Sequence, residues 1–199
     1  MMKKLLKFLF VLLVSNSMFG QQNDTETNEK SNPIIYVDFF GGFSAMKHVG
    51  FSGGAELNYQ SGKSLFSLRF VNATGYTRMD NLLIVVPYYY KSEENNEYSF
   101  LYGRRWLKEN HSYSISTGIS YNNFERAFRD PDENRFEYNS NFCGVPFEAN
   151  YKWYYKKRRS NLVYNALIPS VGLKIFGNIG KYSYFGAGVS VGFGLSKYY

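Results

Sequence analysis

The chain has 199 residues, of which 44% are hydrophobic and 20% aromatic, and its formal net charge is +7. This small basic surplus is interleaved with acidic residues, which excludes the charge pattern of a nucleic-acid-binding protein. The single cysteine, Cys143, excludes an intrachain disulfide. No cluster of Cys and His offers the ligands of a structural metal, and no cofactor motif is present.

The first 32 residues are expected to lie outside the folded domain. Residues 1–20 resemble a secretory signal peptide, in which three lysines lie near the start of the apolar run Leu5–Val14. That run is too short to span a bilayer as a helix, and we expect cleavage after Ser17 or before Gln21. Residues 21–32 contain no apolar side chain and predict a flexible periplasmic leader. Residues 33–199 therefore form the folded domain.

Eight segments of this domain alternate apolar and polar residues, the pattern of strands with two unlike faces. The predicted strands are Ile34–Ala45, Phe51–Gln60, Ser64–Thr74, Glu97–Leu107, Ser112–Asn122, Phe142–Trp153, a seventh that begins within Leu162–Pro169 and ends at Phe176, and a closing strand within Tyr182–Tyr199. An even number of strands places both ends of the domain on the same side of the sheet.

The predicted connections differ in length on the two sides. Gly75–Asn96 and Asn123–Asn141 are long, and Met46–Gly50 joins the first two strands on the same side. Ser61–Lys63 and Lys108–His111 are short turns on the other side, but Tyr154–Asn161, also on that side, is longer than expected. Long connections outside and short ones in the periplasm are typical of outer-membrane barrels.

The closing strand has an apolar face and a face of only glycine and serine. Ala187 begins the apolar face, and Val191, Phe193 and Leu195 continue it. The opposite face indicates an enclosed space rather than open water. The chain ends on Tyr199, which resembles the aromatic ending of bacterial outer-membrane barrels. These four residues, Val191, Phe193, Leu195 and Tyr199, are therefore the predicted signal for closure and assembly.

The sequence predicts an all-β fold, an eight-stranded antiparallel up-and-down transmembrane β-barrel. No segment after the signal has the roughly 20 apolar residues of a transmembrane helix, so strands are the remaining way to span a membrane. The abundant Tyr and Phe would form aromatic girdles. The main alternative is a soluble eight-stranded calyx of the lipocalin kind, which would bury the large apolar residues from every strand and expose the Gly and Ser face.

The polar faces carry three acidic and four basic residues that are predicted to point into the barrel. An eight-stranded barrel is just wide enough for side chains to fill, and an unpaired buried charge is costly. We therefore expect a salt-bridged plug, with a charged pore as the alternative. The predicted network comprises Asp38, Glu56, Arg69, Arg105, Glu148, Lys152 and Lys174, with Glu148 facing Lys174 and reaching toward Arg105.

The signal, the alternation and the ending GVSVGFGLSKYY together resemble small eight-stranded outer-membrane barrels of the OmpX and OmpA type, and the porin-family barrel domains of Gram-negative bacteria. The stretches that carry the resemblance are Ser67–Phe70, Phe100–Arg104, Ser116–Tyr121, Gly144–Trp153 and Gly172–Ile179. It implies the fold and a place in the cell outer membrane. It implies no particular activity, because one fold hosts many functions.

The sequence favours a non-enzymatic protein with a structural or surface-interaction role through its outer loops. A small-solute channel is the second hypothesis and an outer-leaflet lipid-modifying enzyme the third. The enzyme would need His48, which has no Ser or acidic residue at a recognisable spacing; His111 falls on the periplasmic side.

Several partners are predicted for this role. These are outer-membrane lipid, the barrel-assembly machinery through the C-terminal strand, and a protein or glycan ligand at the outer loops, where Tyr88–Tyr90 form an aromatic surface. No nucleic acid is expected and the protein is expected to be monomeric. The basic cluster Lys156–Arg159 is interpreted as a solvated turn.

Overall fold

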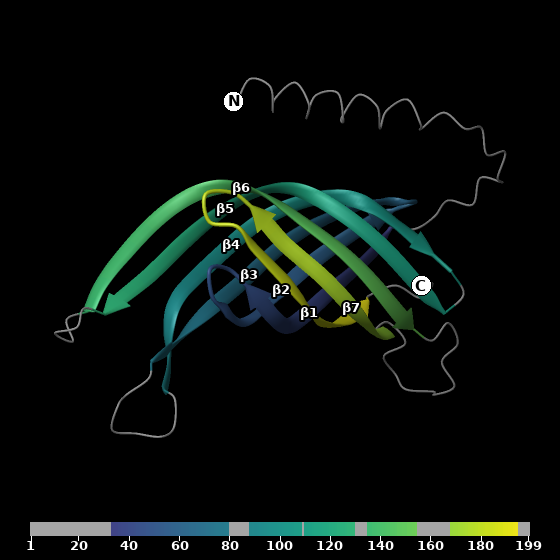
Figure 1. Cartoon of the computed structure of the whole chain (residues 1–199). Helices are drawn as coiled ribbons and strands as arrows, with labels where there is room; N and C mark the ends of the chain where they lie inside the picture. The colour runs from purple at the N-terminus through teal and green to yellow at the C-terminus, as the bar shows by residue number, and fades with distance from the viewer. Residues whose placement is uncertain (1–32, 80–87, 109, 130–134, 155–167, 195–199) are drawn as a thin grey trace, which may run out of the picture. The chain divides into compact units, whose positions relative to one another are not determined.

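Eight antiparallel strands form a closed barrel in which each strand pairs with its sequence neighbour and the last pairs with the first (Figure 1). The computed structural model describes residues 33–79, 88–108, 110–129, 135–154 and 168–194. The strands are β1 (Ile34–Ala45), β2 (Val49–Ser61), β3 (Ser64–Met79), β4 (Tyr88–Leu107), β5 (His111–Arg129), β6 (Arg135–Tyr154), β7 (Ile168–Ile179) and β8 (Tyr184–Gly194). The predicted fold class, an eight-stranded up-and-down antiparallel barrel, is confirmed.

Closure of the barrel depends on the pairing of β8 with β1. The register runs from Ala45 opposite Phe185 to Tyr36 opposite Gly194. Gly42 lies opposite Gly188 at this seam, and a Cβ on Gly42 would lie only 2.4 Å from the Gly188 Cα. Glycine is therefore required on both sides of the seam, because the two backbones approach too closely for a side chain.

The prediction of two long connections on the outer side is wrong, because most residues of Gly75–Asn96 and Asn123–Asn141 belong to strands. β3 continues to Met79 and β4 begins at Tyr88, while β5 continues to Arg129 and β6 begins at Arg135. Polar residues such as Ser92, Glu93 and Asn95 occupy buried positions in these segments, so hydrophobic alternation could not identify them. They pair instead through the backbone ladders of two long hairpins. Pro87 lies outside the described residues.

The β3–β4 hairpin contains a β-bulge. Gly75 lies opposite Glu93 and the next residue, Tyr76, lies opposite Lys91, so that Ser92 is the extra residue. As a consequence, Ser92 and Glu93 are both buried although they are adjacent in the sequence. The bulge thus turns a serine and a carboxylate inward at one point near the outer mouth.

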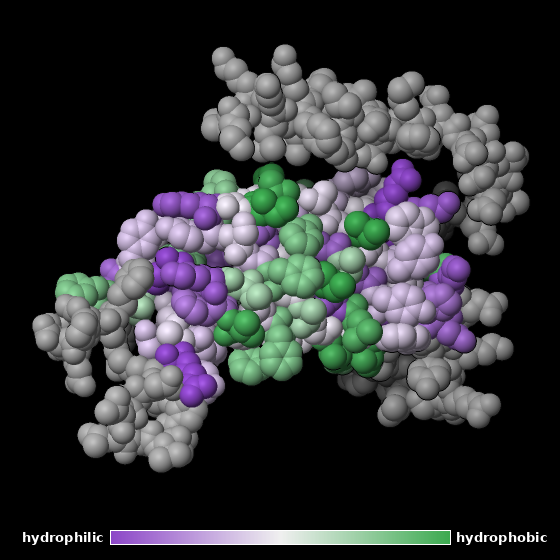
Figure 2. Space-filling model, viewed as in Figure 1, coloured by the Kyte–Doolittle hydropathy of each residue, from purple (hydrophilic) through white to green (hydrophobic). Residues whose placement is uncertain are grey.

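An apolar belt covers the outward face of the barrel. It ends sharply toward the end that carries the β3–β4 and β5–β6 connections, which is the end predicted to face outside the cell and is called the outer side below. Figure 2 shows hydrophobic side chains gathered across the middle of one face, with hydrophilic ones on both sides. Exposed side chains in the belt include Phe39, Leu57, Leu68, Ile115, Ile119, Val171, Leu173 and Val189. Toward the outside the belt gives way to polar residues, between Tyr121 and Asn123 on β5 and between Cys143 and Asn141 on β6. No helix in the described ranges is long and apolar enough to cross a membrane.

The barrel wall has unequal heights at its outer mouth. The β1–β2 and β7–β8 connections, residues 46–48 and 180–183, are short and close at the edge of the apolar belt. β3, β4, β5 and β6 continue beyond that level as two hairpins (Figure 1). We call these four strand extensions, residues 74–79, 88–96, 123–129 and 135–141, the tall wall.

Candidate functional site

All seven charged residues predicted to line the lumen are buried in it, each at most 3% exposed. They come from six strands: Asp38 (β1), Glu56 (β2), Arg69 (β3), Arg105 (β4), Glu148 and Lys152 (β6), and Lys174 (β7). The strict alternation of each strand explains this placement, because every second side chain must face inward. The structure divides the seven into a central group and a second group on the side of the β2–β3 turn, the side predicted to be periplasmic, which we call the periplasmic group.

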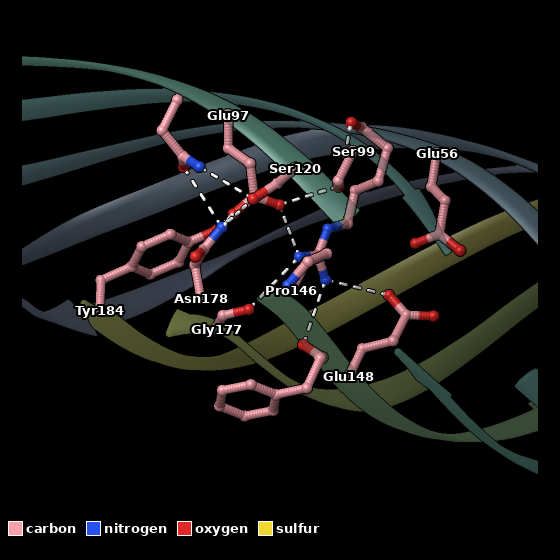
Figure 3. A network of polar contacts seen from close by, with 12 residues as sticks. Glu56, Glu97, Ser99, Ser120, Pro146, Glu148, Gly177, Asn178 and Tyr184 are labelled. Atoms are coloured by element: carbon pink, nitrogen blue, oxygen red, sulfur yellow. Dashed lines mark hydrogen bonds and ion pairs between the residues drawn. The ribbon is translucent and has the colours of Figure 1, made fainter. Parts of the chain in front are cut away.

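The central group is a chain of ion pairs that crosses the lumen, and Figure 3 shows the part of it that contains Glu97 and Glu148. Lys174 contacts Glu56, and its Nζ lies 2.9 Å from Glu148 Oε2. Arg69 Nη1 lies 3.3 Å from the same Glu148 oxygen, and Arg69 Nη2 lies 2.6 Å from Glu97 Oε1. Charges of opposite sign therefore alternate along the chain, and each cation contacts two carboxylates.

Glu97 is the member of this group that the sequence analysis missed. The side chains of Asn178 and Tyr184 donate hydrogen bonds to Glu97 Oε2 at 2.6 and 2.8 Å, and Ser99 donates one to Oε1 at 2.8 Å. With Arg69, the carboxylate has four partners, and its side chain is fully buried. A signal was present, because Glu97 has the same parity on its strand as Ser99 and Arg105.

The periplasmic group centres on Asp38 and Lys152, which contact each other across the lumen from β1 and β6. The Asn58 amide donates to Asp38 Oδ2 at 3.5 Å. Arg105 donates to Gln60 at 3.3 Å and to Ser112 at 3.0 Å. The guanidinium also lies over the Tyr36 ring, 4.5 Å from its centroid, and the Lys152 amine lies 5.2 Å from the same centroid.

Two details of the predicted pairing differ from the structure. Glu148 reaches Lys174 as expected, but its second partner is Arg69 and not Arg105. Similar distances from Gly62 in the turn predict similar heights for Glu56 and Arg69, and the two are opposite each other in the β2–β3 register. Glu56 nevertheless pairs with Lys174 of the opposite wall.

Arg69 also satisfies backbone groups where Pro146 interrupts a ladder. The β5–β6 register is broken between the Thr117–Phe147 and Ser120–Gly144 pairs, because Pro146 has no N–H to donate. Arg69 donates to the carbonyl oxygens of Phe147 and Gly177 at 3.3 and 3.4 Å. A single guanidinium thus links β3 to the interrupted part of β6 and to β7.

Apolar side chains fill the lumen on the outer side of the ion pairs. Phe40, Val71, Ala73, Phe176 and Tyr184 form one buried cluster. The Lys174 amine lies 4.3 Å from the centroid of the Phe40 ring, so the apolar cluster and the ion pairs are in contact. Burial is tolerated because each charge has a partner of opposite sign or several hydrogen bonds. In the described ranges no group of three or more His, Cys, Asp and Glu could hold a metal ion.

A second polar cluster lies at the outer mouth, around the bulge. Arg126 Nε donates to Glu93 Oε1 at 2.8 Å, and His48 Nδ1 lies 3.5 Å from Glu93 Oε2. The Ser92 hydroxyl is also 3.5 Å from His48 Nδ1, and it donates to the Gly75 carbonyl at 3.3 Å. The sequence has no serine or acidic residue at a recognisable motif spacing from His48. The structure supplies both, but serine and carboxylate meet the same ring nitrogen.

The predicted closure residues fall only partly within the described ranges. Val191 lies opposite Phe39, and Phe193 lies opposite Val37, in the β1–β8 register. The Phe39 and Phe193 rings are in edge contact, with their centroids 6.4 Å apart. Several predicted features lie outside the described residues. They are Leu195 and Tyr199, the signal and leader of residues 1–32, and the predicted connection after Tyr154 with its basic cluster Lys156–Arg159.

One large hollow lies on the outside of the barrel. It has a volume of about 860 Å³, and exposed Leu57, Leu68, Phe100 and Ile119 contribute to its lining. The hollow is therefore bounded largely by the apolar belt, and inward-facing Glu56, Arg69, Ser99 and Ser120 also contribute to its lining.

The fold and its interior define the class of protein: an eight-stranded antiparallel β-barrel with an ion-paired, side-chain-filled lumen and an apolar outer belt. No protein-family model matches the chain, and no curated protein sequence is similar to it.

Among solved structures, the N-terminal β-barrel domain of Pseudomonas aeruginosa OprF is 12% identical, covers 82% of this chain and 99% of its own, and has a TM-score of 0.49. Neisserial surface protein A is 11% identical over 82% of this chain and 96% of its own, with a TM-score of 0.46. Ail of Yersinia pestis is 9% identical over 81% and 96%, with a TM-score of 0.44. These scores are below 0.5, so the fold assignment rests on the closed register of the eight strands.

Proposed function

We propose that this protein is an outer-membrane β-barrel with a closed lumen, and that it acts at the cell surface through its tall wall, in a structural or surface-interaction role. The observation that carries the membrane location is the reversal of polarity. Phe43 and Ile119 are 65% and 72% exposed, whereas the Arg69 and Glu97 side chains are fully buried. In water this arrangement would lose hydrophobic stabilisation at every strand, but in lipid it is favourable.

The tall wall supports the surface role. Beyond Val145, β6 pairs only with β5 in the described register, so one edge of its outer segment carries unpaired backbone groups. Phe136 and Tyr138 are 58% and 43% exposed on this segment. Exposed aromatic residues beside an open strand edge are the elements that contact surfaces use. The partner proposed is a protein or glycan outside the cell.

A closed lumen favours this role over a channel. A conducting pore needs a continuous water path, but the ion pairs of Lys174 and Arg69 join opposite walls. The aromatic side chains of Phe40 and Phe176 occupy the level next to them, with ring centroids 4.9 Å apart. A channel would require both layers to move.

We propose further that the protein is not an enzyme. A nucleophilic serine needs a base that accepts its proton, but the Ser92 hydroxyl donates to a backbone carbonyl and is itself only 4% exposed. The carboxylate of Glu93 is held by Arg126 rather than orienting His48 alone. We propose further that the barrel is monomeric and is assembled by the barrel-assembly machinery through its C-terminal strand.

The test compares the parent with a variant in which residues 126–138 are replaced by an Asn-Gly turn. Both should fractionate with outer membranes of a Gram-negative host and migrate faster on gels before boiling than after it. Only the parent should increase attachment of the host cells to one another or to immobilised glycans. Recovery of folded parent from the soluble periplasm would contradict the membrane location, and equal attachment by both proteins would contradict the role of the tall wall.

A further inference from the structure

A lysine at the outer edge of the apolar belt is surrounded by hydroxyls and aromatic rings. The Lys181 amine, in the β7–β8 connection, donates to the Tyr138 hydroxyl at 3.3 Å and to Ser140 Oγ at 3.0 Å. It lies 5.9 Å from the Tyr138 ring centroid and 5.3 Å from that of Tyr182. The side chain is therefore held in place although it is exposed to solvent.

The rings beside Lys181 are themselves packed firmly. Tyr182 stacks on Phe124 of β5, with centroids 4.0 Å apart, and meets the edge of Phe142 of β6. Phe124 is only 1% exposed. A second cation, Arg126, lies 5.6 Å from the Tyr182 ring centroid. We call Tyr138, Ser140, Lys181 and Tyr182 the rim cluster.

The charge of Lys181 is not neutralised by a carboxylate within the described part of the chain, where its partners are hydroxyls and rings. Lys91 in the tall wall provides the contrast. Its amine lies 2.5 Å from Glu94 Oε2, and it is exposed in a similar way. A fixed, exposed cation without a carboxylate beside it attracts anions more strongly than one in an ion pair.

The rim cluster lies at the level where the apolar belt ends. Ile179, two residues before Lys181, is 63% exposed, and Phe185, three residues after Tyr182, is 49% exposed. On β6 the outward face changes from Cys143 to Asn141 next to the cluster. In a membrane this is the height of the lipid headgroups. Tyr138 and Ser140 share the inward parity of Glu148 on β6, so a headgroup would approach them over the short β7–β8 connection that carries Lys181.

We propose that the rim cluster binds the phosphate-bearing sugar headgroup of an outer-leaflet glycolipid. A phosphate oxygen would accept hydrogen bonds from the Lys181 amine and from the Tyr138 and Ser140 hydroxyls, all of which converge on one point. The exposed part of the Tyr182 ring would lie against the sugar, since tyrosine combines an apolar face with a polar tip. This proposal rests on the outer-membrane location proposed above.

The test measures binding of a fluorescent, acylated and diphosphorylated glucosamine disaccharide to the full barrel in zwitterionic micelles, by fluorescence anisotropy. Its dephosphorylated form and free glucosamine 1-phosphate serve as competitors. Lys181→Ala should weaken binding about tenfold and Tyr138→Phe about threefold, as expected for the loss of a charge-assisted and a neutral hydrogen bond. Lys91→Ala, the matched control, should bind like the parent.

Three results would overturn the proposal. The first is equal affinity for the phosphorylated and dephosphorylated lipids, and the second is an equal loss in Lys91→Ala and Lys181→Ala. The third is competition by the free phosphosugar as strong as by the lipid, which would mean that the ligand is not a membrane headgroup. Each protein is checked for the gel shift of a folded barrel first. A missing shift in the parent would count against the membrane barrel itself, and is therefore separable from a failure of the rim cluster.

Discussion

Arg69 on β3 and Glu148 on β6 meet across the lumen, with Nη1 3.3 Å from Oε2. The two residues belong to opposite walls, so their contact joins the halves of the barrel through its interior. The same guanidinium reaches Glu97 on the next strand, and the same carboxylate reaches Lys174 on β7. Because neighbouring ion pairs share Arg69 and Glu148, the partners that each substitution leaves in place determine how much stability the barrel should lose.

Glu148→Gln should destabilise the barrel by about 1–3 kcal/mol, the cost of leaving buried donors poorly satisfied. The cost stays moderate because Lys174 keeps Glu56 and Arg69 keeps Glu97. Urea unfolding in lipid vesicles measures it, with the exposed Glu125→Gln as a control. Single-channel recording of the same variant is the second readout, and a small conductance is the expected sign of a loosened plug. A variant as stable and as silent as the parent would contradict the plugged lumen.

Asp38→Asn should cost more, about 3–5 kcal/mol, because it leaves the buried Lys152 without a carboxylate. The ion pair with Asp38 is the one described for Lys152, and its other close group is the Tyr36 ring. The same urea titration compares the two variants directly. If Glu148→Gln proved the more damaging, the division into a central and a periplasmic group would be wrong.

Tyr184→Phe should destabilise the barrel by about 1.5–3 kcal/mol, the range for a hydrogen bond to a charged group. The Tyr184 hydroxyl donates to Glu97 at 2.8 Å in a site where the tyrosine is 3% exposed. Tyr113→Phe is the matched control, since Tyr113 is 38% exposed in the outer belt. Equal midpoints for the two variants would show that Glu97 does not depend on this bond.

Closure of the barrel should depend on the glycine seam between β1 and β8. Gly188→Val places a branched side chain where even a Cβ would lie 2.1 Å from the Gly41 carbonyl oxygen. We expect a loss of the folded, fast-migrating band. Deletion of Leu195–Tyr199, or a polar residue in place of Tyr199, should also reduce assembly, for which the assay is recovery of folded protein in outer membranes. Normal assembly of all three would mean that the closing strand is not the assembly signal.

Binding of the phosphorylated glycolipid should weaken as the pH rises above 8. Hydrogen bonds with Tyr182, Ser140 and Lys181 lower the pKa of Tyr138 to about 8. Loss of the phenol proton adds a negative charge beside Lys181, which opposes an anionic ligand, while the hydrogen bond with Tyr138 raises the pKa of Lys181 and keeps its amine positive in this range. Tyr138→Phe should remove the pH dependence between about 7 and 9. A parent whose affinity is the same across that range would contradict this role of the phenol.

The interior charges could be predicted from the sequence because alternation fixes the face of each residue. Asp38, Glu56 and Lys174 needed only their position in a strand. The Lys174–Glu148 pair joins neighbouring strands and could also be predicted. The Lys174–Glu56 pair could not, since it crosses the lumen through the stagger of the strands around the barrel. That stagger is a property of the closed sheet and is absent from any single strand's pattern.

The outer extensions could not be predicted for a different reason. Glu93, Asn95 and Asn122 are buried polar residues that occupy inward positions of long hairpins. Asn95 donates to Asn122 at 3.0 Å, so the polar side chains satisfy one another. Hydrophobic periodicity is lost where buried positions are polar, so the sequence of Gly75–Asn96 and Asn123–Asn141 predicted connections.

Planar-bilayer recording of the parent barrel tests the central claim, a membrane-spanning barrel whose lumen is closed by paired side chains. Insertion is verified on the same vesicles by the difference in gel migration before and after boiling. The account predicts inserted protein that gives no conductance steps. Regular steps of uniform size from the inserted parent would contradict it, because they require a continuous water path past Arg69 and Glu148.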